Sequence, residues 1–517
     1  MSEARRPDAR LVVLTDLDGM LEPCGCTSRP LGGIDRLAAK LEELRAERIP
    51  FATVLAGNVF FHGAPHGGDA ERARSQEELR ADALVEILGG LDVAAATPGS
   101  EDLGFGAATF DGLAERLSAP ILAAGVTVGE RAFASSRTVT LGDLRVGILG
   151  LTDLNRPDGT LPDGVSVADD ELRVLGAQAA RELREAGADV VVALVNAERR
   201  TTRRVATGIE GVDFVIQGGL DQADVNPPAD TEGATILHAG RQGQGFVVLD
   251  LYRGAGELRD VSAWTVEAQR THLDEGIESL EGRIASWEAE GRPDAELAAQ
   301  RERLSRMRRE RDALSVPAVG AGKAFSARYI ELPPEAERSP TVRARMVALD
   351  RRINDVNREA FADWAPEPAP EGAAHYVGSN ACGSCHSEAM RWWRGHPHGH
   401  AYATLADQHK NFNLSCVGCH VTGYLEPGGS TVTHTGPLEN VGCESCHGPG
   451  SIHVGDPAGD AGRMIRDPEE ARCARCHTPD HSDRFDYTAY RATLLVPGHG
   501  RPSEAASNGS ARPARGD

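Results

Sequence analysis

At residues 382–386 the chain reads Cys382-Gly383-Ser384-Cys385-His386, and the same Cys-x-x-Cys-His pattern returns at 416–420, 443–447 and 473–477. Two thiols three residues apart can form thioether bonds to the two vinyl groups of one haem, while the adjacent imidazole reaches the iron. The four motifs therefore predict four covalently bound haem c groups. Their anchors and proximal iron ligands are Cys382, Cys385, His386, Cys416, Cys419, His420, Cys443, Cys446, His447, Cys473, Cys476 and His477.

Zinc ribbons and redox dithiols also use Cys-x-x-Cys pairs. Neither kind of site requires a histidine directly after every second cysteine, so the fourfold repeat favours haem. Covalent haem attachment takes place outside the cytoplasm in bacteria, which predicts a periplasmic or otherwise extracytoplasmic protein. Residues 1–10 lack the apolar run of a signal peptide. We therefore expect that the given start is too late or that the signal has been removed.

Histidines outside the motifs decide how reactive each iron is. A second imidazole gives a six-coordinate electron-transfer iron, whereas an empty position leaves a site for substrate. Gly/Pro-rich loops favour His398, His453 and His499 as distal ligands. Nine histidines compete for the four positions: His375, His396, His398, His400, His409, His434, His453, His481 and His499.

The segments that flank the motifs resemble the tetrahaem cytochrome c family of ammonia oxidisers, over about 373–500. The resemblance implies a mostly helical, haem-packed domain with mixed bis-His and open irons, and a redox partner protein such as the hydroxylamine oxidoreductase that serves this family. By position it favours His398 and His453 as distal ligands. The segments that carry it are 376–379, 392–401, 421–424 and 441–450.

Apolar residues at steps of four and three predict a helical spacer over 265–364. Two helices flank Gly291-Arg292-Pro293 and can fold back as a hairpin, and a third begins after Ser339-Pro340. The stripes are compatible with a dimer and with an intramolecular bundle. A Pro-rich linker at 365–370 precedes the haem region, and residues 502–517 have the composition of a disordered tail.

Residues 10–255 alternate short apolar runs with amphipathic stretches, which predicts an α/β domain with strands buried between helices. The expected strands are 11–14, 51–55, 93–96, 120–123, 146–149, 190–194, 214–217 and 246–251. The expected helices are 34–46, 77–88, 169–186 and 201–210.

The loops after these strands resemble those of calcineurin-like metallophosphoesterases of the 5′-nucleotidase type, which hold two metals to activate water. Only Asp16 matches a family ligand, and every imidazole is lost, so we expect a non-hydrolytic domain. Carboxylates in such loops are often solvated or capping, but the remaining oxygens could hold a single divalent cation. The residues at the ligand positions are Asp16, Asp18, Asn58, Ser100, Glu101, Asn196, Leu220 and Gln222, of which Asp16, Asp18, Asn58 and Glu101 form the candidate cation site.

Cys24 and Cys26 follow Asp18 closely and are the only cysteines outside the haem motifs. A disulfide between residues so close in the chain is strained and hence a relatively oxidising couple, suited to exchanging electrons with haems. An inert thiol pair and a structural disulfide are the alternatives.

The chain has 517 residues and a formal charge of -22, with 77 Asp and Glu against 55 Lys and Arg. This balance opposes nucleic-acid or anionic-membrane partners, and no segment reaches the roughly 18 apolar residues of a membrane span. We predict a multihaem electron carrier whose first domain is a docking or redox-loop module. The alternatives are a redox enzyme acting on a small nitrogen or sulfur species at an open haem, and a metal-dependent phosphoesterase with an attached cytochrome.

Overall fold

The computed structural model describes residues 5–23, 28–62, 69–156, 158–168, 170–220, 225–459, 464–479 and 481–501. The chain divides into two compact units. The first comprises residues 1–23, 31–66 and 84–342, and the second comprises 24–30, 67–83 and 343–517. The expected tail at 502–517 lies outside the described residues.

The first unit is built on two sheets. The larger has the order β13-β14-β12-β1-β2-β3, with bounds Ala255–Asp260, Gly322–Glu331, Gly245–Tyr252, Ala9–Thr15, Phe51–Ala56 and Val93–Thr97. The smaller has the order β11-β10-β9-β7-β6, with bounds Thr235–Leu237, Phe214–Gly218, Val190–Asn196, Leu144–Thr152 and Ser136–Leu141. Strands β1, β2 and β3 are parallel to one another, as are β7, β9, β10 and β11. A further small sheet contains β5 (Arg131–Ala132), β4 (Val126–Val128) and β8 (Val165–Val167).

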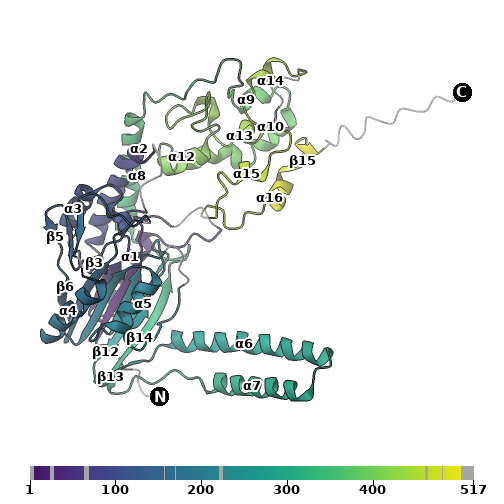
Figure 1. The fold of residues 1–517 in the computed structure, drawn as a ribbon. Coiled ribbons are helices and arrows are strands. Elements are labelled where there is room, and N and C mark those ends of the chain that lie inside the picture. Colours follow the sequence, from purple (N-terminus) through teal and green to yellow (C-terminus); the bar gives the residue numbers. More distant parts are fainter. Residues whose placement is uncertain are drawn as a thin grey trace. The chain divides into compact units, whose positions relative to one another are not determined.

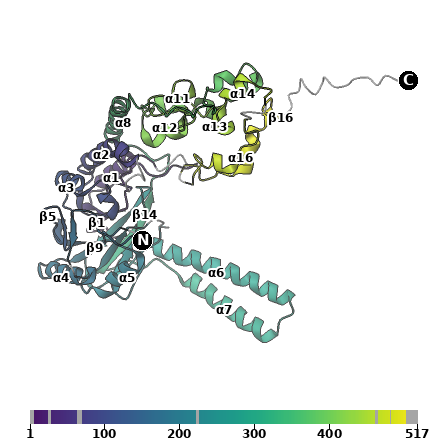
Figure 2. The ribbon, with the colours of Figure 1, turned by 45° about the horizontal axis from the view of Figure 1, so that its top comes forward.

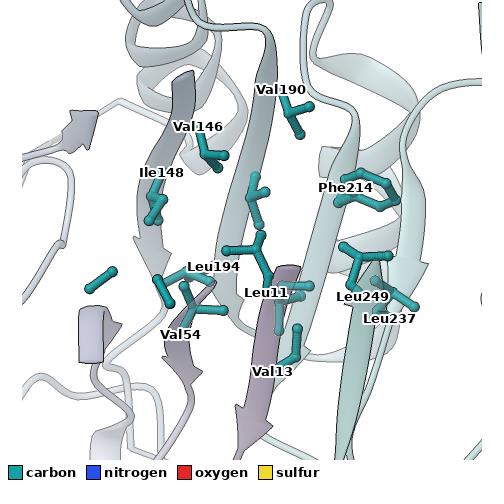
Figure 3. Close-up of a cluster of buried hydrophobic side chains, with 14 of the residues drawn as sticks. Leu11, Val13, Val54, Val146, Ile148, Val190, Leu194, Phe214, Leu237 and Leu249 are labelled. Carbon is teal, nitrogen blue, oxygen red and sulfur yellow. The ribbon is translucent and has the colours of Figure 1, made fainter. Parts of the chain in front are cut away.

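The main core fills the space between the two large sheets, where Leu11, Val13 and Val54 meet Val146 and Phe214 (Figure 3). The sequence of strand β9 illustrates why the α/β architecture could be predicted. Its residues 190, 192 and 194 enter this core, while 191, 193 and 195 join a second cluster with the inner sides of two helices. Because both faces of the strand are covered, its sequence is apolar throughout, as is typical of parallel strands.

The expected α/β domain is confirmed. The helices of this unit are α1 (Ile34–Ala46), part of α2 (Asp69–Leu88), α3 (Ala107–Arg116), α4 (Leu172–Glu185) and α5 (Arg199–Gly208). Residues 120–123 form isolated bridges through Ile121 and Leu122 rather than a strand of their own.

The spacer expected over 265–364 is not purely helical, because Gly322–Glu331 is strand β14. It pairs antiparallel with β12 from Gly245 to Tyr252, and its Ala324, Phe325 and Ala327 are buried. Strand β14 thus belongs to the α/β unit, whose chain extends beyond the expected boundary at 255. The two spacer helices before it are an insertion between β13 and β14.

Those helices, α6 (Ala263–Ala289) and α7 (Asp294–Ala313), form the expected hairpin and lie side by side in both views (Figures 1 and 2). Leu280 and Ile284 of α6 pack on Leu297 of α7. Outside this seam the helices are joined by exposed ion pairs, Arg308 with Glu281 and Arg311 with Asp274. The apolar stripes of α6 and α7 therefore pack against each other within one chain.

The second unit is a helical region of short elements after the long helix α8 (Pro340–Ala360). A small core gathers around Val417, with Phe361, Tyr402, Val421 and Val432. None of the helices described here is both long and apolar enough to cross a membrane. The other helices are α9 (Ser379–Cys382), α10 (Ser387–Trp393), α11 (Ala401–Ala406), α12 (Leu414–His420), α13 (Cys443–His447), α14 (Ser451–Gly455), α15 (Glu470–Cys473) and α16 (Tyr487–Leu494), followed by the short strands β15 (Val496–Pro497) and β16 (Gly500–Arg501).

Candidate haem centre

Each Cys-x-x-Cys-His motif forms or follows a single helical turn. In the first, the amide of His386 donates to the Cys382 carbonyl at 2.9 Å, and in the fourth His477 donates to Cys473 at 3.0 Å. In such a turn, side chains at positions i, i+3 and i+4 share one face. The two thiols and the imidazole of a motif therefore face the same side, as attachment to one haem requires.

Three motif histidines each face a histidine from elsewhere in the chain. The ring centres are 6.4 Å apart for His386 and His453, 6.1 Å for His477 and His398, and 6.1 Å for His447 and His499. A histidine nitrogen lies about 2 Å from a bound metal, so two imidazoles on opposite sides of one iron have ring centres about 6 Å apart. The three separations therefore match those expected with an iron between the rings.

The fourth motif histidine, His420, has no such companion. Among the described residues no histidine ring lies against it, and its Nδ1 is 2.5 Å from the carbonyl of Ala401. Of the remaining candidates, His396 contacts His398 and Trp392, rather than a motif histidine. The others without a motif partner in the described structure are His375, His400, His409, His434 and His481.

The hydrogen bonds of these rings leave one nitrogen for a metal. Nδ1 of His447 lies 2.6 Å from the Ile465 carbonyl, and Nδ1 of His499 lies 2.7 Å from that of Leu494. A backbone carbonyl accepts only from a protonated nitrogen, which leaves Nε2 with its lone pair. These contacts favour the tautomer that an iron ligand needs.

Burial favours the neutral form of the same rings. It lowers the pKa of His398 to about 4, with further lowering from His396 and His477 nearby. The pKa values of His447 and His477 are also lowered, mainly by burial. A neutral imidazole binds metal without first losing a proton. The donor set of the second unit thus fits haem iron at neutral pH.

Thiols of different motifs lie next to one another. A hydrogen bond with Cys382 lowers the pKa of Cys443 to about 6, and one with Cys476 lowers the pKa of Cys419 to about 7. These contacts bring the first motif beside the third and the second beside the fourth. Short separations of this kind suit electron exchange between neighbouring haems.

The loops at the carboxyl ends of β1, β2 and β10 meet around Asp16, as the resemblance implies. Its Oδ1 accepts hydrogen bonds from the amides of Gly219 at 2.8 Å and Asn58 at 3.2 Å. Burial raises the pKa of this carboxyl to about 7, although the backbone donors act in the opposite direction. Asp16 therefore already has donors where a metal would need its oxygens.

Asp18 is equally engaged, because Nη2 of Arg241 donates to its Oδ2 at 2.9 Å. The Asn58 side-chain oxygen accepts from the amide of Glu101 at 3.2 Å. In the described part of this unit, no group of three or more His, Cys, Asp and Glu side chains is arranged to hold a metal ion. The geometry favours an arginine as the counter-charge of Asp18. Sequence reasoning missed Arg241, which lies far from Asp18 in the chain.

Asn196 stands at another position where the metallophosphoesterase family has a metal ligand, and here its side chain is engaged within the protein. Asn196 is buried and its amide donates to Thr152 Oγ1 at 3.3 Å and to the Asp153 carbonyl at 3.1 Å. The pair Cys24 and Cys26 and the expected position Gln222 lie outside the described residues.

Solved structures similar to this chain include a 5′-nucleotidase precursor from Thermus thermophilus, with 17% identity, a TM-score of 0.46, and coverage of 75% of this chain and 67% of that one. A sulfate thiohydrolase from Thermus thermophilus has 14% identity and a TM-score of 0.45, over 85% of this chain and 74% of that one. A calcineurin-like phosphoesterase from Bacillus subtilis has 18% identity and a TM-score of 0.39, over 49% of this chain and 87% of that one.

For the C-terminal region, a curated relative is cytochrome c-554 of Nitrosomonas europaea, which is 32% identical. The similarity covers 20% of this chain and 58% of the relative, so the chain spans somewhat more than half of the relative's length. The resemblance that the haem motifs predicted is confirmed by these matches. Residues 381–448 match the family described as cytochrome c554 and c-prime.

Proposed function

We propose that the second unit is a tetrahaem electron carrier that works outside the cytoplasm with a redox partner protein. The observation that carries the proposal is the set of three facing histidine pairs, His386 with His453, His477 with His398, and His447 with His499. When bound, each haem supplies a one-electron couple of its iron. The two imidazoles of each pair would both hold the iron, which would suit a couple that changes charge without binding substrate.

The residues of the chain hold the cofactors in three ways. The eight motif cysteines anchor them covalently, and the motif histidines are the proximal ligands. Carbonyls at Ala401, Ile465 and Leu494 fix the Nδ1 proton of the ring beside each of them. Burial lowers the pKa values of His398, His447 and His477 and so favours their neutral form. The curated relative's name supports a cytochrome role for this region.

A second candidate function rests on His420, which faces no histidine in the described structure. An iron with one protein ligand has a position free for a small molecule. The unit would then be a redox enzyme for a small nitrogen or sulfur species at this haem. Electron transfer through the three paired haems would serve either role.

Intact mass and carbon monoxide binding test both functions on protein produced in a periplasm. We expect a mass gain of four haems, and a carbon monoxide shift of the reduced spectrum that corresponds to one haem. A smaller mass gain would overturn the tetrahaem assignment. The absence of any shift would remove the enzyme and leave the carrier, because every iron would then be closed.

We further propose that the first unit is non-hydrolytic, and that Cys24 and Cys26, in the segment 24–30 that belongs to the second unit, form a redox loop for the haems. The support comes from Ser28, two residues beyond Cys26, whose amide and hydroxyl each donate to Asp483 at 2.8 Å. Asp483 follows Ser482, whose Oγ lies 3.0 Å from Nδ1 of His477. Oxidation of the two thiols to a disulfide would release two protons to solvent and two electrons, and two ferric haems, each a one-electron acceptor, would be the oxidant.

The double substitution Cys24→Ser and Cys26→Ser tests this loop. We expect normal haem loading and slower reduction of the haems by an added dithiol, because the relay from thiol to haem is lost. Rapid-mixing absorbance at the reduced haem band measures the rate. Substitution of Asp483 by Ala is the matched variant, since it keeps both thiols and removes the anchor of Ser28. Wild-type rates in both variants would contradict the proposal.

A further inference from the structure

Glu444 lies between the two cysteines of the third motif and is almost fully buried, with 1% of its surface exposed. Its carboxylate accepts hydrogen bonds from three backbone amides. Val377 donates at 3.0 Å, Gly378 at 2.7 Å and Gly450 at 2.8 Å. Among the described residues, no arginine or lysine forms an ion pair with it. Burying a carboxylate that has no cationic partner costs free energy, and the hydrogen bonds from the amides offset part of that cost. Such a group indicates that a carboxylate is needed at this position.

The three donors come from two segments that serve the first haem motif. Val377 and Gly378 lead directly into α9, which ends at Cys382. Gly450 is the residue before α14, which carries His453. Glu444 therefore joins, through one carboxylate, the approach to the first motif and the helix that faces it.

Helix α14 has little else to hold it. None of its residues is fully buried: Ile452 is half-buried and Val454 is exposed, so apolar packing contributes little to its position. Besides Gly450, its first residue contacts the chain near the first motif, where the amide of His375 donates to Ser451 Oγ at 2.9 Å. His453 nevertheless faces His386 with the rings 29° apart in orientation. The polar contacts at the start of α14, which include the Ser451 amide donating to the His375 carbonyl at 3.2 Å, favour this order.

We propose that Glu444 is a positioning residue that holds His453 opposite His386, so that the third haem motif controls the sixth ligand of the first haem. This inference rests on the proposed function. Glutamine has the same size but offers one acceptor oxygen, and its amide hydrogens would point at backbone N–H groups. Gly378 and Gly450 donate to different carboxylate oxygens, so Glu444→Gln is expected to lose one of the two and with it the link between the first motif and His453.

The experiment uses full-length, haem-loaded protein and compares Glu444→Gln with His453→Ala. We expect both variants to keep the wild-type haem mass, to bind carbon monoxide at one haem more than the wild type, and to convert one ferric haem from low spin to high spin. Added imidazole should restore the low-spin signal in both. The double variant should resemble His453→Ala alone, because both changes remove one ligand. Glu439→Gln is the control, since Glu439 is exposed, and it should match the wild type.

The possible results distinguish a failure of the Glu444 positioning role from a failure of the proposed haem ligands. If His453→Ala leaves the spin state and carbon monoxide binding unchanged, the assignment of His453 as a ligand is wrong. If His453→Ala opens a haem and Glu444→Gln behaves as the wild type, the positioning role is wrong. Glu444→Asp gives a second test if Glu444→Gln does not accumulate, because it keeps the charge but its shorter side chain cannot reach Val377, Gly378 and Gly450 together. A wild-type spin state in Glu444→Asp would then overturn the inference.

Discussion

Replacing Cys416 and Cys419 by serine is expected to yield a protein with one haem fewer that no longer binds carbon monoxide. Without thioether bonds the haem beside His420 is lost, and it is the haem with no histidine opposite in the described structure. Intact mass and the reduced spectrum with and without carbon monoxide measure both changes. The expected change is the complete loss of the carbon monoxide shift.

The helix that carries this motif should remain folded in the variant, because its start is held by protein contacts. The side-chain oxygen of Gln76 accepts from the amide of Leu414 at 3.0 Å, and Asn357 Nδ2 donates to the Phe412 carbonyl at 2.8 Å. The matched control replaces Cys473 and Cys476 by serine. It should lose a haem of equal mass and retain the carbon monoxide shift. Retention of that shift in the first variant would show that the open iron lies elsewhere.

The second large effect is expected in the α/β unit, on replacing Asp250 by alanine. Arg10 on β1 lies opposite Asp250 on β12, with Nε and Oδ1 2.6 Å apart, and their exposed fractions are 2% and 4%. Without Asp250, the buried Arg10 keeps only Glu47 as a partner, at 2.8 Å and half exposed. Breaking a buried ion pair costs about 3–5 kcal/mol of the free energy of unfolding, and because Glu47 remains we expect a loss near the lower end, about 3 kcal/mol. Urea unfolding followed by far-ultraviolet circular dichroism, with haem absorbance recorded separately, measures the loss.

Asp143→Ala is the control for this change. Asp143 forms a 3.5 Å ion pair with Arg253, but 89% of its side chain is exposed. Exposed pairs contribute little because water and salt screen them. Its unfolding curve should coincide with that of the wild type. Equal curves for Asp250→Ala and Asp143→Ala would contradict the assigned role of the buried pair.

Local patterns made much of the α/β fold predictable. Helix α1 has the bounds that the sequence predicted, 34–46, because its apolar spacing, the glycines at 32 and 33 before it and Pro50 shortly after it mark its ends. Strand β14 was missed because its ten residues carry a weak alternation, and its partner β12 is remote in the chain. Its identity as a strand depends on a register that no local window contains.

In the candidate haem centre, too, some features follow from local sequence and others depend on contacts between distant segments. A fixed spacing within five residues predicted the attachment sites. The opposition of His447 and His499 depends on how loops fold, and composition alone could only favour certain histidines. Trp392 stacks on His499 with ring centres 4.8 Å apart, and sequence reasoning treated that tryptophan only as part of a resemblance. Contacts between distant loops leave no periodic signal in the sequence.

The hairpin of α6 and α7 has a consequence for the order in which the first unit folds. Strands β13 and β14 pair in parallel, yet the whole hairpin separates Asp260 from Gly322. Closing so long a loop before any contact compensates for it is slow, since chain entropy opposes it. Antiparallel helices form from contacts near in sequence and return the chain to its starting point. The folded hairpin thus lowers the entropic cost of bringing β14 next to β13. We expect the edge of the larger sheet to form only after α6 and α7 have packed together.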